Sequence, residues 1–89
     1  MRVPNYKVSS HALDRVKNRW PAESKPKNPE RFLVKAALLG EDLGYLETEK
    51  ASLRYLTPVT VLVDEIRNVI ITAVIGRKDK VAWSNEVKR

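Results

Sequence analysis

A histidine and two arginines recur at helical spacing near the start of the chain. His11, Arg15 and Arg19 stand four residues apart, and His11 is the sole histidine among the 89 residues. On a helix these side chains lie one turn apart along a single edge. Imidazole exchanges a proton near neutral pH, and guanidinium groups bind phosphate through paired hydrogen bonds. The pattern indicates a phosphodiester site, with His11 as general acid or base and the arginines on the phosphate. The alternative is a solvated basic helix face.

The composition argues against several other kinds of site. The chain has no cysteine, which excludes disulfides and cysteine-ligated zinc, and one histidine cannot build a histidine-rich metal centre. The three glycines, Gly40, Gly44 and Gly76, are isolated, so no glycine-rich phosphate loop is present. We therefore predict no metal and no cofactor, and interpret the paired carboxylates of the middle segment as solvated charges. No apolar run approaches the ~20 residues that a membrane span needs.

Positive charge is concentrated at the two ends of the chain. The net charge is +6; residues 1–29 hold seven Lys/Arg against two Asp/Glu, whereas residues 30–68 hold five against seven. If the ends meet in the fold they form one basic face, which would attract nucleic acid. The other predicted nucleic-acid-binding residues are Lys7, Lys17, Lys25, Lys27, Arg77 and Lys78.

The first half of the chain predicts two helices within residues 10–40. Residues 1–9 form an extended lead-in, and Ser9 or Ser10 caps a helix over about 10–20 whose buried stripe is Ala12, Leu13 and Val16. A proline-rich loop follows. Asn28 and Pro29 then mark the start of a second helix, and Gly40 is predicted to end it in the left-handed conformation.

The second half has the period of strands. Short strands are predicted at 45–48 and 52–56, and stronger ones at 59–63 and 69–75, joined by a polar hairpin at 64–68. Residues 81–83 are predicted to form an edge strand or a docked tail, so that the antiparallel sheet spans 45–84 and a basic tail spans 85–89. The residues expected to face the helices are Val59, Val61 and Val63, with Ile71, Ala73 and Ile75 or their alternates.

The order of elements predicts a single α+β domain over residues 1–89. Two N-terminal helices would pack on one face of a twisted antiparallel sheet of three to five strands. Thr60 and Thr72 interrupt apolar strands, and either hydroxyl could face a cleft. Trp20, Tyr55 and Trp83 could stack on bases, although packing in a small core is the more common use of such residues.

Residues 6–19 resemble the opening of small proteins related to RelE- and BrnT-type toxins. Those proteins have a short strand and then T/S-x-H-A-x-x-R-x-x-x-R on the first helix, and the segment Val69-Ile70-Ile71-Thr72-Ala73-Val74 resembles their late strand. The resemblance implies a barnase-like α+β fold and metal-independent cleavage of RNA to a 2′,3′-cyclic phosphate. It would make His11 the acid or base, place Arg15 and Arg19 on the phosphate, and put Thr72 in the cleft.

Three functions follow from these observations. The first is a cytoplasmic, toxin-like ribonuclease that acts on RNA and is held by an acidic antitoxin. The second is a non-catalytic basic module, of phage or regulatory type, that binds nucleic acid or an acidic host protein. The third is an interaction domain that forms a homodimer through the edge near residues 81–83.

Overall fold

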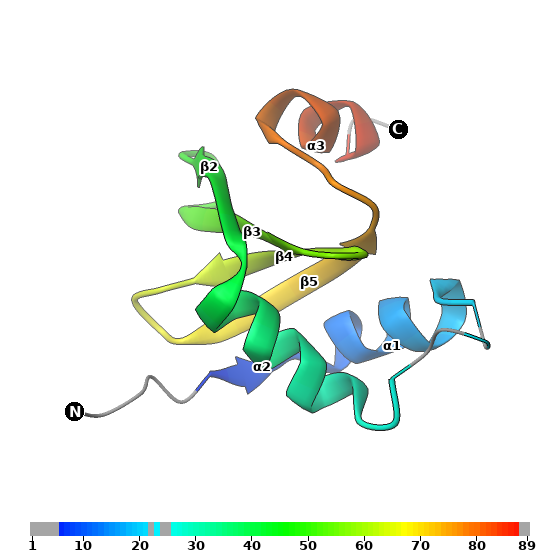
Figure 1. The fold of residues 1–89 in the computed structure, drawn as a ribbon. Helices are drawn as coiled ribbons and strands as arrows, with labels where there is room; N and C mark the ends of the chain where they lie inside the picture. The colour runs from blue at the N-terminus through cyan, green and yellow to red at the C-terminus, as the bar shows by residue number, and fades with distance from the viewer. Residues whose placement is uncertain (1–5, 22, 24–25, 88–89) are drawn as a thin grey trace.

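The chain folds as an α+β domain in which helices lie against both faces of one sheet (Figure 1). The structure is a computed structural model, and it describes residues 6–21, 23 and 26–87. Helices α1 and α2 lie below the sheet in the view of Figure 1, and α3 lies above it. The elements of the described chain are β1 (Lys7–Val8), α1 (Ser10–Arg19), α2 (Pro29–Leu39), β2 (Glu41–Leu46), β3 (Ala51–Leu56), β4 (Val59–Asp64), β5 (Val69–Ile75) and α3 (Lys80–Val87).

The sheet is mixed rather than wholly antiparallel as predicted. Its strand order is β1-β5-β4-β3-β2, and the four strands from β2 to β5 pair antiparallel. Strand β1 runs parallel to β5. The backbone N–H of Lys7 donates to the carbonyl of Asn68 at 2.8 Å, and the backbone N–H of Ser9 donates to the carbonyl of Ile70 at 3.1 Å. A strand of two residues carries no alternation from which its direction could be predicted.

Both predicted helix starts are confirmed, each with a capping side chain. The Ser9 hydroxyl accepts from the backbone N–H of Ala12 at 3.1 Å and donates to the carbonyl of Ile71 at 2.6 Å, so it fixes α1 against β5. The amide oxygen of Asn28 accepts from the N–H of Arg31 at 3.1 Å, and Pro29 occupies the first turn of α2. These caps satisfy N–H groups that the helix itself leaves without a partner.

Gly40 ends α2 as predicted, but the predicted left-handed conformation is wrong. Its backbone is extended, with φ −68° and ψ 157°, because the chain enters β2 at Glu41 without an intervening loop. A Cβ atom at this position would collide with the carbonyl oxygen of Ala36 and would lie 3.0 Å from that of Tyr55. Glycine is therefore required here for close packing of backbone on backbone.

Two hydrophobic clusters lie on opposite faces of the sheet. The larger one joins α1 and α2 to Val59, Val61, Val63 and Ala73, with Ile75 packed against it, as predicted. Ile71 instead packs into the second cluster, so its predicted orientation is wrong. The register between β4 and β5 shifts at Leu62/Val63, so that Ile70 pairs with Val63 and replaces Ile71 in the larger cluster.

The C-terminal segment forms helix α3 where residues 81–83 were predicted to be an edge strand or a docked tail, and residues 88–89 of the predicted basic tail lie outside the described residues. The carboxylate of Asp79 accepts from the N–H of Ala82 at 2.9 Å and thereby caps the start of α3. Trp83 is 4% exposed and packs with Leu53 and Leu62 in the second cluster. The run of three apolar residues at 81–83 is too short to separate a strand from one turn of a helix, and only the aspartate before it marks a helix start.

Candidate nucleic-acid interface

The side chains of His11, Arg15 and Arg19 lie together on the outer side of α1. Ala12 and Val16 are buried in the larger cluster and turn that side of the helix inward. His11 and Arg19 are exposed, and Arg15 is partly buried. The buried stripe thus fixes the rotation of α1 about its axis and holds the three polar side chains outward in one row.

A first shallow hollow is formed by α1 itself. It has a volume of about 270 Å³ and is lined by His11, Asp14, Arg15, Asn18 and Arg19. The carboxylate of Asp14 lies three residues from His11, which places both on neighbouring turns of the helix surface. One hollow therefore holds a carboxylate, an imidazole and two guanidinium groups.

A second hollow lies between α1 and the end of β5. It has a volume of about 210 Å³ and is lined by Arg15, Arg19, Ala73, Val74, Ile75 and Lys78. Because Arg15 and Arg19 line both hollows, the two adjoin across these arginines. Three cationic side chains from two distant parts of the sequence therefore line the same hollow.

A buried threonine holds the segment that carries Lys78. The Thr60 hydroxyl is 0% exposed, donates to the carbonyl of Gly76 at 2.6 Å and accepts from the N–H of Lys78 at 2.9 Å. This pair of hydrogen bonds fixes the backbone that follows β5 against β4. Thr60 is thus a support for the site, and its hydroxyl faces no cleft.

Thr72 does not join the three residues of α1. It pairs with Leu62, which belongs to the second cluster together with Trp83. Cross-strand partners project from the same face of a sheet, so Thr72 projects to the face that α3 covers. Its neighbour Ala73 belongs to the larger cluster on the other face, and Thr72 is not among the residues that line either hollow.

The other predicted basic residues are dispersed. Arg77 turns toward the far edge of the sheet and donates to Glu41 at 2.8 Å; that hydrogen bond raises the pKa of Arg77 above its usual value. Lys7 lies beside Val69, at the opposite end of β5 from Lys78. Lys17 is exposed on α1 but lines neither hollow, Lys27 is exposed just before α2, and Lys25 lies outside the described residues.

The two tryptophans are used in packing. Trp20 is 6% exposed and meets Phe32 edge to face, with ring centroids 5.1 Å apart and planes at 80°. Trp83 projects from α3 and is buried against Leu53 and Leu62 of the sheet, and Tyr55 is partly buried on β3. The rings of both tryptophans are therefore closed to a stacked base.

Two kinds of feature are missing from the described part of the chain. No group of three or more His, Cys, Asp or Glu residues there is arranged to hold a metal ion. None of the helices that the structure describes has the length and hydropathy required to cross a bilayer.

Asp14 is the site residue that sequence reasoning missed. It follows His11 by three residues, and this spacing on a helix is the signal that could have identified it. The sequence offers no protein nucleophile beside the pair, so the pair alone predicts no catalytic site.

Comparison with protein-family models, with curated proteins and with solved structures finds no match to the chain.

Proposed function

We propose that the protein binds single-stranded RNA through the adjoining hollows of α1 and β5. The observation that carries this proposal is the convergence of Arg15, Arg19 and Lys78 on one concave surface. Guanidinium and ammonium groups bind phosphate oxygens through charge-assisted hydrogen bonds. A single phosphate group of a flexible strand can enter a hollow of this size, whereas the broad surface of a duplex cannot.

The charge around the hollows also favours a polyanion. Among the described residues that line the two hollows, Asp14 is the sole carboxylate, against two arginines and a lysine. The resemblance to RelE- and BrnT-type toxins supports RNA as the polyanion. The lack of cysteine suits the reducing cytoplasm, where such an RNA target would be met.

Fluorescence anisotropy with a labelled single-stranded RNA of 12 nucleotides tests this proposal. We expect Arg15→Glu/Arg19→Glu to weaken binding by about 100-fold, since two phosphate contacts become repulsive. Lys17→Glu/Lys27→Glu is the matched control: it changes the net charge equally at exposed positions outside both hollows, and should weaken binding less than about tenfold. Equal losses in the two variants would show a diffuse charge effect and contradict the proposed site. A DNA strand of the same sequence tests the preference for RNA.

A second candidate function is cleavage of the bound RNA, which the presence of His11 and Asp14 in one hollow favours. The nucleophile is the 2′-hydroxyl of the RNA, so no protein nucleophile is needed. The Asp14 carboxylate takes the proton of that hydroxyl, the oxygen attacks phosphorus, and the bond to the 5′-oxygen breaks. Protonated His11 gives its proton to the leaving 5′-oxygen, and Arg15 and Arg19 stabilise the charged transition state. The products are a 2′,3′-cyclic phosphate and a 5′-hydroxyl.

Cleavage is tested with the same RNA in the presence of EDTA, with products resolved by mass. We expect wild-type protein to yield the cyclic phosphate, and His11→Ala and Asp14→Asn each to slow cleavage by at least about 100-fold while RNA affinity stays within a few-fold. A strand with one 2′-deoxyribose at the cleaved position should remain intact. If wild-type protein leaves the all-RNA strand intact, cleavage is rejected and RNA binding stands on its own measurement.

A further inference from the structure

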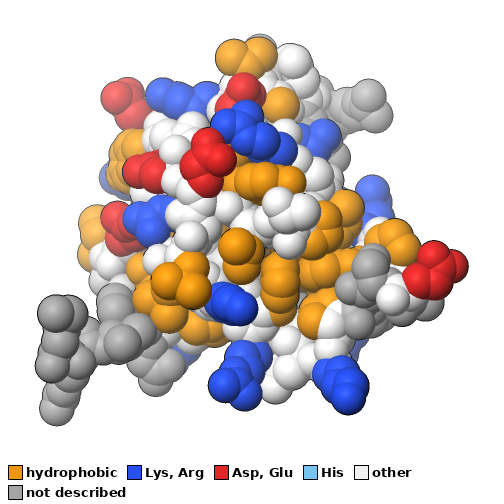
Figure 2. All heavy atoms as spheres, viewed as in Figure 1, with side chains coloured by type: hydrophobic (Ala, Val, Ile, Leu, Met, Phe, Trp, Pro, Cys, Tyr) orange, Lys and Arg blue, Asp and Glu red, His pale blue; other side chains and the backbone are white. Residues whose placement is uncertain are grey.

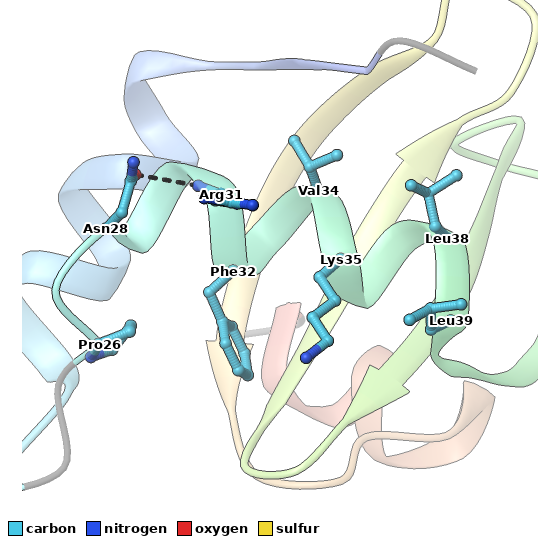
Figure 3. A pocket seen from close by; sticks show the side chains of 8 residues that line it. All are labelled: Pro26, Asn28, Arg31, Phe32, Val34, Lys35, Leu38 and Leu39. Atoms are coloured by element: carbon cyan, nitrogen blue, oxygen red, sulfur yellow. Dashed lines mark hydrogen bonds between the residues drawn. The ribbon is translucent and has the colours of Figure 1, made fainter. Parts of the chain in front are cut away.

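The outward surface of α2 forms a third, chemically different hollow (Figure 3). Its volume is about 860 Å³, and its lining is mostly apolar: Pro26, Asn28, Arg31, Phe32, Val34, Lys35, Leu38 and Leu39. Phe32, Lys35 and Leu39 project on one flank of the helix and Val34 and Leu38 on the other, with the sheet behind (Figure 3). This surface shares no residue with the hollows of α1.

Leu39 is left largely uncovered on this surface, and its apolar neighbours Phe32, Val34 and Leu38 are half-buried. Leu39 is 69% exposed, although it lies within a helix whose inner face is fully packed by Leu33, Ala36 and Ala37. Over α2, Figure 2 shows orange apolar side chains with blue cationic ones between and below them. Apolar patches bordered by charge are typical of surfaces that receive a partner.

The charges around the patch indicate which partner it suits. Arg31 and Lys35 line the hollow, and no Asp or Glu is among the described residues that do so. A second copy of the chain would bring these cations against the same cations, which is repulsive. A partner with apolar side chains flanked by carboxylates would bury the leucines and pair both cations.

We propose that the outward surface of α2 docks an acidic amphipathic helix of a partner protein. Eleven residues of α2 extend over about 16 Å. That length matches three turns of a helix with apolar anchors at positions i, i+3 or i+4 and i+7, the usual mode of helix docking in a groove. This surface is separate from the RNA site, so the proposal does not depend on the function proposed above.

A designed peptide pair tests the docking. The acidic probe is an 18-residue helix with leucine at i, i+3 and i+7 and glutamate beside them, and its matched control carries lysine in place of glutamate. We expect wild-type protein to bind the acidic peptide and not the basic one. Leu39→Asp should lower the affinity for the acidic peptide by at least about tenfold. Arg31→Glu/Lys35→Glu should make the protein bind the basic peptide more tightly than the acidic one.

Variants of the other surface separate docking from general attraction to negative charge. Arg15→Glu/Arg19→Glu should leave the affinity for the acidic peptide within about threefold of the wild-type value. Addition of the acidic peptide to this variant should change the amide chemical shifts of residues along α2. Loss of peptide binding in this variant, or equal binding by wild-type and Leu39→Asp protein, would overturn the proposal. A dimer in sedimentation that Leu39→Asp dissociates would also overturn it, because it would assign the surface to a second copy.

Discussion

The arginines of α1 and those of the sheet differ in what surrounds them. Arg54, on β3, donates to the carbonyl of Ala37 at 3.0 Å and forms an ion pair with Glu65. Arg77 pairs with Glu41 across the end of the sheet. Arg15 and Arg19 instead line two hollows in which the described residues supply one carboxylate for two arginines and a lysine.

This difference separates cations that hold the fold from the cations that we propose bind RNA. Arg54 reaches the last turn of α2, where backbone carbonyls lack helical partners, and so ties that helix to β3 and to the β4–β5 turn. The positive field of such a residue is largely cancelled within the protein. A net charge of +6 alone does not reveal which cations face a partner; the distribution of carboxylates around them does.

The largest effect is expected for the removal of Arg54. Arg54→Ala should lower the free energy of unfolding by about 2 kcal/mol, since it removes charge-assisted hydrogen bonds from a side chain that is 22% exposed. Denaturation by urea measures this loss, and RNA affinity should stay unchanged. Arg15→Ala/Arg19→Ala is the matched comparison and should show the reverse, with stability retained and RNA affinity reduced. A similar loss of stability in both variants would remove the distinction.

A carboxylate placed beside Arg15 and Arg19 should neutralise part of their positive charge, as Glu65 does for Arg54. Asn18 lines the first hollow, so Asn18→Glu puts a negative charge against Arg15 and Arg19. We expect RNA affinity to fall by about fivefold, measured by anisotropy, with the melting temperature unchanged. Asn18→Gln, which adds the same length without charge, should bind like the wild type. If Glu and Gln weaken binding equally, shape and not charge governs this hollow.

The smallest effect is expected at Arg77. Glu41→Gln removes its partner, but both side chains of the pair are at least half exposed, so no measurable change in stability should follow. RNA affinity should rise by less than about twofold, because Arg77 points away from the hollows. A larger gain would show that Arg77 belongs to the RNA site and that pairing with Glu41 restrains it.

The sequence predicts local structure well where one strong signal marks each element. Ser9, Asn28 and Pro29 locate the two helix starts, and the β-branched runs locate β4 and β5. It fails where the decisive interaction is distant in sequence. The extended backbone of Gly40 depends on the carbonyl of Tyr55, fifteen residues away, and the orientation of Ile71 depends on a register shift opposite Leu62.

The candidate site shows the same division. The spacing of His11, Arg15 and Arg19 places them in one row, because a helix fixes the geometry of residues four apart. Thr72 is sixty-one residues from His11, and its position is decided by the alternation of β5 and not by local spacing. Lys78 joins the arginines because the chain after β5 is tied to Thr60, an interaction that no local pattern reveals.

The unpaired edge of β5 bears on how the protein associates with copies of itself at high concentration. Strand β1 pairs only with Val69 and Ile70, so beyond Ile70 no strand in the described part of the chain lies on that side of β5. An open edge of this kind recruits strands from other molecules, and nearby positive charge is a common protection against such aggregation. Arg15 and Arg19 lie beside the edge at Ala73, Val74 and Ile75. We therefore predict that the two side chains proposed to bind RNA also disfavour edge-to-edge pairing of neighbouring copies.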